Sequence, residues 1–284
     1  FSNVQIIIVA EPLNKEEIQV AIDQYNDPRL TLIFNKERMG ISYSLNVGLK
    51  NAKAEYIARI DTDDIADPQR LIKQYQYLEQ NPDISMCVSN YEYFGDMNEG
   101  RVIFEGEMSR AWSLLTCPFD HPTVMFRKSF FEQNNLMYDE KLRYAEDWDL
   151  WLRAFEKGMT VGCIPETLLY HRWHNGSAGQ QEDSNNRMKE IIQENFRKFG
   201  VEIPWEYIPA FSPWWGKTWS DEAYRTLEET FDQVLKKNKE LKLYDQQALE
   251  RVFHLRLDEA RTGELKELSW KTKGEPSATV SHDT

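Results

Sequence analysis

The stretch YIARIDTDDIADPQR, residues 56–70, places an apolar run directly before a group of carboxylates. Residues 56–60 have the side chains of a short buried strand, and Asp61, Asp63 and Asp64 follow where that strand ends. Mutual repulsion raises the free energy of such a cluster unless a cation or another partner compensates it. The stretch therefore predicts a strand of a sheet with a strongly acidic loop at its carboxyl end.

Strands and helices alternate on both sides of this stretch. The apolar spacing predicts strands at 5–10, 30–34, 56–60 and 84–94, and helices at 14–25, 41–53 and 68–79. Asp67 is expected to cap the last of these helices, with Pro68 at its first position. Such alternation favours an α/β fold with a mostly parallel sheet flanked by helices, in which ligands bind beyond the carboxyl ends of the strands. The acidic cluster falls at that edge.

The second half of the chain is less regular and ends in helices. Its patterns predict strands at 121–127 and 161–170, and helices at 146–157, 188–199, 222–237 and 246–260. The last dozen residues are small and polar, as in a frayed tail. We therefore expect an α/β domain over residues 1–181 and a helical extension with a polar tail over residues 182–284.

Composition excludes several classes of protein. The chain has 34 Lys and Arg against 47 Asp and Glu, a net charge of -13, which argues against a nucleic acid as partner. It has no apolar stretch of about 18 residues that would span a bilayer, and its first residues have the pattern of a strand and not of a secretory signal. Cys87, Cys117 and Cys163 lie far apart, as expected of reduced thiols in a cytosolic protein.

The acidic cluster has two interpretations. It is a hydrated loop, or it is a site for Mg²⁺ or Mn²⁺, which proteins often hold by one or two carboxylates together with a substrate diphosphate. In an extended segment Asp61 and Asp63 would point the same way, while Asp64 would turn aside. Under the second interpretation both of the first two carboxylates face one ligand.

Two further segments carry polar groups that suit chemistry. In the helix that starts at residue 146, Asp147 and Asp149 flank a buried stripe on opposite sides, so at most one of them faces a shared pocket. The helix dipole explains carboxylates at this position, and a general base at Asp147 is the functional alternative. Arg172 and His174, expected just past the strand at 161–170, would suit a diphosphate and its cation, although such histidines are often structural.

Together, these parts resemble the family 2 glycosyltransferases, which are inverting enzymes with the GT-A fold. The resemblance covers roughly residues 4–179 and rests on the segments ERMGISYSLNVGLKNAKAEYIARIDTDDIADPQRL (37–71), HPTVMFRKSFF (121–131), EDWDLWLRAFEKG (146–158) and HRWHNGSAG (171–179). It implies that the domain over residues 1–181 is a GT-A catalytic domain. The partner of the acidic cluster would then be a divalent metal, Mn²⁺ or Mg²⁺, carrying a nucleotide-sugar diphosphate.

The resemblance also implies a role for each matching acid. Asp61 matches the family's acid near the ribose and sugar of the donor. Asp63 matches the acid that contacts the metal, and Asp64 accompanies it. Asp147 matches the catalytic base.

The remaining matches concern the donor and its metal. His174 matches the histidine that completes the metal or diphosphate contacts, with Arg172 beside it. The donor pocket is expected to be lined by Lys36, Gly40 and Asn46. Where the family ends its second strand with Asp-Asp-Gly-Ser, this chain has VAEPL, and Glu11 is left to read the base. The nucleotide therefore stays open, with a UDP-sugar as first choice, and the family's first strand-helix unit is expected upstream of residue 1.

The function that the resemblance implies is transfer of a sugar from a nucleotide-diphosphate donor to an acceptor hydroxyl by metal-assisted in-line displacement. The acceptor would be a saccharide or a lipid-linked glycan in surface polysaccharide or glycolipid assembly. A cytoplasmic location is expected, with peripheral contact at the inner face of the plasma membrane left open. Two alternatives are a sugar nucleotidyltransferase and a GT-A-like binding module without catalytic activity.

The helical extension contains an aromatic segment and one clear helix. Ser220 has the position of an N-cap, and the helix after it carries an apolar stripe at Ala223, Leu227, Phe231 and Val234. The run PWWGKTW, residues 213–219, has two interpretations: its rings anchor a helix onto the domain, or they stack on sugar faces or a membrane surface.

Overall fold

The computed structural model describes residues 3–97, 99–101, 103–174, 182–215 and 219–263, and the backbone of 269–270. Its strands are β1 (Ile6–Ala10), β2 (Leu30–Phe34), β3 (Tyr56–Ala58), β4 (Ile65–Ala66), β5 (Met86–Gly95), β6 (Gly100–Arg101), β7 (Met125–Arg127), β8 (Val161–Trp173) and β9 (Ser269–Trp270). Its α-helices are α1 (Lys15–Asp23), α2 (Ile41–Asn51), α3 (Arg70–Gln80), α4 (Gly106–Trp112), α5 (Lys128–Gln133), α6 (Glu146–Glu156), α7 (Glu182–Arg197), α8 (Asp221–Leu241) and α9 (Gln246–Thr262). The expected polar tail lies outside the described residues.

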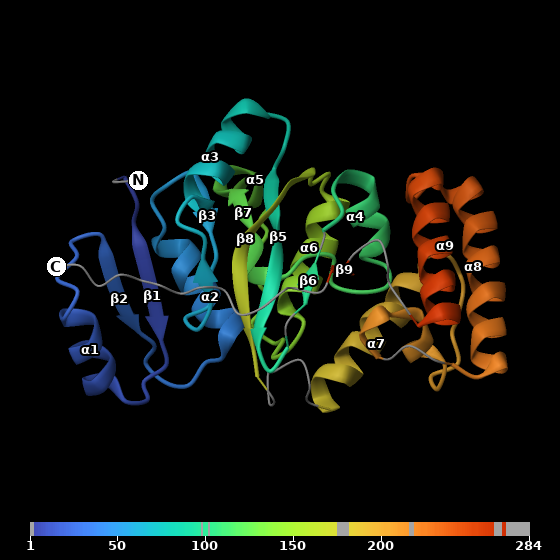
Figure 1. The fold of residues 1–284 in the computed structure, drawn as a ribbon, viewed down its shortest axis with the longest axis horizontal. Coiled ribbons are helices and arrows are strands. Elements are labelled where there is room, and N and C mark those ends of the chain that lie inside the picture. Colours follow the sequence, from blue (N-terminus) through green and yellow to red (C-terminus); the bar gives the residue numbers. More distant parts are fainter. Residues whose placement is uncertain are drawn as a thin grey trace.

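The strands form a mixed α/β arrangement (Figure 1). β1 and β2 pair in parallel, and β5 pairs in parallel with β8 along its whole length. β7 lies between β3 and β5 and is antiparallel to both. The α/β fold class predicted from the sequence is confirmed, and the central sheet is mixed, because β4, β6 and β7 run antiparallel to the strands they pair with.

The segment before β7 is a correction to the predicted strand at 121–127. Residues His121–Thr123 form a short 3-10 turn, η1, and the strand starts only at Met125. Pro122 has no backbone N–H to donate to a ladder, and the Thr123 N–H donates to the carbonyl of Asp120 at 2.9 Å. The turn brings His121 into the interior instead of alternating it across a sheet.

The last central strand is longer than predicted. β8 does not end at Tyr170, because His171 and Arg172 lie opposite Tyr93 and Phe94 of β5 and continue the parallel pairing. Both residues therefore lie within the strand and not just past its end. Their positions are fixed by backbone hydrogen bonds of the central sheet.

The acidic segment is also not extended. The Asp64 N–H donates to the carbonyl of Asp61 at 3.3 Å, so the chain turns between β3 and β4. Asp67 accepts a hydrogen bond from the Gln69 N–H at 2.8 Å, and α3 starts at Arg70, slightly later than predicted. Strand alternation therefore does not orient Asp61 and Asp63, because the turn sets their directions.

Two apolar cores meet at α6. A sheet core lies between the central sheet and the inner face of α6, with Trp151 fully buried in it. A helix core is built from α4, α7, α8 and α9 and takes in Trp148 from α6. Figure 1 shows the α8–α9 hairpin at the opposite end of the molecule from β1 and β2. The two cores fix the start of α6 between the sheet and the helices.

The predicted stripe on α8 is confirmed. Ala223, Leu227, Phe231 and Val234 are all buried in the helix core. The Phe231 ring stacks on Phe253 of α9 at 3.9 Å between centroids, and the Ser220 hydroxyl caps the helix by accepting from the Ala223 N–H. Across the described helices, none combines the length and apolar character needed to traverse a bilayer.

Candidate active site

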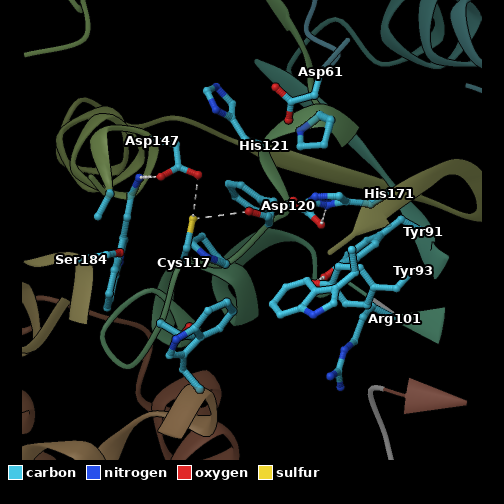
Figure 2. A pocket seen from close by; sticks show the side chains of 18 of the residues that line it. Asp61, Tyr91, Tyr93, Arg101, Cys117, Asp120, His121, Asp147, His171 and Ser184 are labelled. Carbon is cyan, nitrogen blue, oxygen red and sulfur yellow. Dashed lines mark hydrogen bonds and ion pairs between the residues drawn. The ribbon is translucent and has the colours of Figure 1, made fainter. Parts of the chain in front are cut away.

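A cavity of about 630 Å³ lies beside the start of α6, bordered by the central sheet and the helical extension. Among its lining residues are five of the predicted site residues: Asp61, Asp63, Asp147, Arg172 and His174. Figure 2 shows Asp147 on one wall, Asp61 toward one end and His171 across from Asp147. Side chains from β8, the turn after β3 and α6 thus face a common space, although they lie far apart in the sequence.

Asp147 is the second residue of α6 and lies in the cavity wall. Its Oδ1 accepts from the Trp148 N–H at 2.7 Å, and its Oδ2 lies 3.5 Å from the Cys117 Sγ. Burial raises the pKa of Asp147, and these two hydrogen bonds oppose the rise because they stabilise the carboxylate. A carboxylate with a raised pKa is a stronger base than an exposed one.

Glu146 stands beside Asp147 and is buried. Burial and the neighbouring charge of Asp147 raise the pKa of Glu146 to about 8. Two adjacent buried carboxyls cannot both ionise at low cost, so the pair retains a proton near neutral pH. Asp147 can act as a carboxylate base only when Glu146 carries that proton.

Asp63 and His174 form an exposed polar pair in the cavity. The Asp63 Oδ2 lies 3.9 Å from the His174 Nε2, and the two side chains are 44% and 55% exposed. Within the described ranges, no group of three or more His, Cys, Asp or Glu residues is arranged to hold a metal ion. A cation at this pair would therefore take its other ligands from a diphosphate and water, as Mg²⁺ and Mn²⁺ commonly do. The donor set fits that use.

The other two acids of the cluster have partners. Asp61 lines the cavity and forms an ion pair with Arg59. Asp64 turns aside, as expected, and its Oδ1 accepts from the Arg172 backbone N–H at 2.9 Å. Burial raises the pKa of Asp64 to about 6. The Nε of Arg172 donates to the Asp63 carbonyl at 3.2 Å, so Arg172 holds the acidic turn against β8.

The predicted donor-pocket residues lie apart from this cavity. Glu11 accepts hydrogen bonds from the backbone N–H groups of Met39 and Gly40, at 3.2 Å and 2.9 Å, and so ties the loop before α2 to β1. Lys36 is exposed and does not line the cavity. None of the predicted residues Glu11, Lys36, Gly40 and Asn46 is among the lining residues.

Asn46 is buried and does not line the cavity. Its side chain is 2% exposed, and both of its polar atoms bond to the backbone of Tyr138, at 2.9 Å and 3.0 Å. The amide therefore braces the segment before α6 and has no free group to offer a donor. The resemblance implies a place for Asn46 in the donor pocket, but Asn46 does not line this cavity.

Sequence reasoning missed an ion pair in the same cavity. The His171 Nδ1 lies 2.6 Å from the Asp120 Oδ2. Burial lowers the pKa of His171, but attraction and hydrogen bonding to Asp120, with help from Asp64 and Asp61, outweigh it and raise the pKa to about 9. His171 is therefore an imidazolium at neutral pH. His171 opens one quoted segment and Asp120 directly precedes another, but no spacing rule pairs side chains that are 51 residues apart.

One carbonyl connects the cavity wall to the helical extension. The Trp148 indole N–H donates to the Ser113 carbonyl at 2.8 Å. The Asn195 amide of α7 donates to the same carbonyl at 3.2 Å and to that of Leu114 at 3.3 Å. The residue next to Asp147 and a helix of the extension therefore share one acceptor.

The fold is similar to two solved structures that are complexes with nucleotide sugars. One is TarS of S. aureus in complex with UDP-GlcNAc, with a TM-score of 0.56 and 13% identity over 92% of this chain and 83% of that one. The other is the mannosyltransferase PcManGT from Pyrobaculum calidifontis in complex with GDP-Man and Mn²⁺, with a TM-score of 0.52 and 16% identity over 93% of this chain and 78% of that one. The fold is thus GT-A.

Sequence relatives define the family within that fold. The model of glycosyl transferase family 2 matches residues 1–135. An uncharacterized glycosyltransferase, MJ1057, of Methanocaldococcus jannaschii is 34% identical over 59% of this chain and 59% of its own length. The amylovoran biosynthesis glycosyltransferase AmsE of Erwinia amylovora is 29% identical over 58% and 63%. The match over residues 1–135 confirms the resemblance to glycosyltransferase family 2, and the chain spans about three fifths of the length of these curated relatives.

Proposed function

We propose that the chain transfers a sugar from a nucleotide-diphosphate donor to an acceptor hydroxyl, with inversion at the anomeric carbon. The observation that carries the proposal is the shared cavity, which has Asp147 on one wall and the Asp63–His174 pair on another. Relatives named for amylovoran and O-antigen biosynthesis support a role in surface polysaccharide or glycolipid assembly. Cytoplasmic location at the inner face of the membrane is part of the same proposal.

Asp147 is the proposed base. Its carboxylate accepts the proton of the acceptor hydroxyl while that oxygen attacks the anomeric carbon. The bond from that carbon to the diphosphate oxygen breaks on the opposite side, and the electron pair leaves with the diphosphate. The raised pKa of Asp147 favours proton transfer to it, and Glu146 keeps the one proton that the pair retains before the transfer.

Positive groups on the other wall suit the departing diphosphate. His171 is an imidazolium, and Arg172 carries a permanent charge on the adjacent residue of β8. Asp63 and His174 would hold the divalent cation, Mn²⁺ or Mg²⁺, which when bound offsets the charge of the departing diphosphate. Solved neighbours in complex with UDP-GlcNAc and with GDP-Man and Mn²⁺ support a nucleotide-sugar donor, with a UDP-sugar as first choice.

Replacing Asp147 tests the base. Asp147→Asn removes the proton acceptor and keeps the shape, so turnover should fall by roughly 10²–10⁴-fold. Donor affinity should stay unchanged, measured by calorimetry with a panel of UDP- and GDP-sugars in Mn²⁺. Asp149→Asn is the matched control, because Asp149 lies on the same helix but pairs with Arg153, away from the cavity. Full turnover in the Asp147 variant, or equal loss in both, contradicts the base assignment.

Replacing Asp63 tests the metal pair. Asp63→Ala removes one of two candidate ligands, so Mn²⁺-dependent donor affinity should drop while metal-independent binding stays the same. The measurement is donor affinity with Mn²⁺ and with a chelator present. Glu99→Gln serves as control, since Glu99 lines the same cavity but pairs with Arg101. An unchanged Mn²⁺ effect in the Asp63 variant argues against this site.

A further inference from the structure

Four aromatic side chains that line the cavity form an unbroken series of ring contacts, which we name the aromatic wall: Tyr91, Tyr93, Trp173 and Trp214. Neighbouring ring centroids lie 5.2 Å apart for Tyr91–Tyr93 and for Tyr93–Trp173, and 6.1 Å apart for Trp173–Trp214. All four line the cavity. The wall runs from the central strand β5 through β8 to η4 (Pro213–Trp215) in the helical extension.

The three tryptophans of residues 213–219 lie in two different environments. Trp215 donates its indole N–H to the Asn185 Oδ1 at 2.9 Å and packs on the helix core, and Trp219 packs on the same core. Trp214, between Pro213 and Trp215, is 40% exposed and faces the cavity. Anchoring therefore accounts for Trp215 and Trp219 but leaves the Trp214 ring open to a ligand.

Arg101 and Glu99 form an ion pair beside the aromatic wall. Arg101 donates to the Glu99 carboxylate at 2.9 Å, and both line the cavity. Figure 2 shows Arg101 next to Tyr91 and Tyr93, at the end of the cavity away from Asp61. The hydroxyls of a sugar both donate and accept hydrogen bonds, so a paired guanidinium and carboxylate suit them. Because the pair is neutral overall, it favours an uncharged ligand over an anionic one.

We propose that the aromatic wall binds the acceptor as a neutral pyranose, whose apolar face packs on Trp214 and whose hydroxyls meet Glu99 and Arg101. The C–H face of a pyranose is apolar, and cavities lined by aromatic side chains with a few polar groups are typical ligand sites. Asp147 lines the same cavity, so a hydroxyl of a sugar bound there can be directed to the base. This inference rests on the proposed function and narrows the acceptor to a saccharide.

The test compares two exposed tryptophans of the extension. Trp214→Ala removes the ring from the cavity, and Trp205→Ala is the control, because Trp205 is 46% exposed and does not line the cavity. The probes are the methyl glycosides of glucose, galactose, mannose and N-acetylglucosamine, observed by saturation-transfer NMR with UDP and Mn²⁺ present. We expect binding of at least one glycoside to wild type and the control, and about tenfold weaker binding to Trp214→Ala. Trp214→Phe, which keeps a ring, should restore most of it.

Several outcomes overturn the proposal. These are equal glycoside affinity in wild type and Trp214→Ala, no glycoside bound to wild type, and Trp214-dependent binding only to phosphatidylglycerol vesicles. Donor affinity, measured on the same samples with UDP-sugars, separates this from the proposed function. If wild type binds the donor but Trp214→Ala does not change glycoside binding, only the proposed acceptor site is wrong. If wild type binds no donor, the proposed transferase function is wrong. A melting temperature for each variant confirms that it is folded.

Discussion

At the scale of single residues, two opposing effects act on the pKa of Asp147. Burial raises its pKa, and the Trp148 N–H and the Cys117 thiol lower it by hydrogen bonding to the charged form. Burial also raises the pKa of Cys117 well above its usual value, so the thiol keeps its proton at any working pH. The Cys117 Sγ lies 3.3 Å from the Phe119 carbonyl oxygen and 3.5 Å from the Asp147 Oδ2. Cys117 is thus a permanent donor beside the proposed base.

Replacing Cys117 should change the pH dependence of turnover. Cys117→Ala removes a hydrogen bond that favours the carboxylate, so the pKa of Asp147 rises further. A base works only when deprotonated, and therefore the acidic limb of the kcat profile should move to higher pH. Cys117→Ser keeps a donor and should leave the limb nearer its original position. A limb that stays or moves to lower pH in the alanine variant contradicts this account.

The sequence revealed the site residues that stand in recognisable patterns. Asp63 and Asp147 follow from an acidic strand end and a charged helix start, and the structure brings both to one cavity. Asp120 and Cys117 lie in the stretch between α4 and β7, which has no helical or strand periodicity to orient them. The position of Asn46 followed from the resemblance, but its side chain is used to brace the backbone near Tyr138. The roles of the site residues stay predictions.

At the scale of elements, periodicity located most helices within a few residues of their observed ends. It did not give the direction of β7, because three residues carry no information on which neighbours they join or how. It also ended β8 early, since the pairing of His171 and Arg172 depends on β5, which lies far away in the sequence. The local sequence pattern therefore predicts whether a segment is a helix or a strand better than it predicts which strands pair with each other.

Gly95, at the end of β5, lies against the backbone of Trp173 in the aromatic wall. Its φ is +98°, and an added Cβ would lie 2.5 Å from the Trp173 carbonyl oxygen. Gly95→Ala should therefore destabilise the protein, because the Trp173 carbonyl is a backbone group and can make room for the added Cβ only if β8 itself is displaced. The measurement is the free energy of unfolding in urea.

Gly158→Ala provides the matched control for that variant. Gly158 also has a positive φ, +82°, but an added Cβ there would meet nothing within 4 Å. Its replacement should cost about 1 kcal/mol from backbone strain alone. Equal costs at Gly95 and Gly158 are inconsistent with a steric conflict at the end of β5.

At the scale of the whole molecule, we propose a division into a catalytic domain, residues 1–181, and an extension, residues 182–284. The two parts share a core: Trp148, Leu114 and Leu115 pack in the same cluster as Ile192 and Phe196 of α7. All five side chains are buried. The extension therefore completes the hydrophobic interior of the catalytic part and also carries Trp214 into the cavity.

A chain truncated after residue 181 should not fold stably. Removing α7, α8 and α9 exposes the apolar side of the helix core, and each large apolar side chain so exposed costs roughly 1.5–3 kcal/mol. We expect aggregation or binding of a hydrophobic dye, compared with a control that lacks only residues 271–284. A soluble 1–181 fragment with cooperative thermal unfolding speaks against a shared core.

The Ser113 carbonyl links the position of α7 to the orientation of the first turn of α6. It accepts from Trp148, the neighbour of Asp147, and from Asn195 of α7, so the angle at which α6 presents its first turn is set partly from outside the cavity. A tilt of α7 would reorient the proposed base while leaving the acidic turn and its proposed donor contacts where they are. Such a perturbation would slow the chemical step without weakening substrate capture.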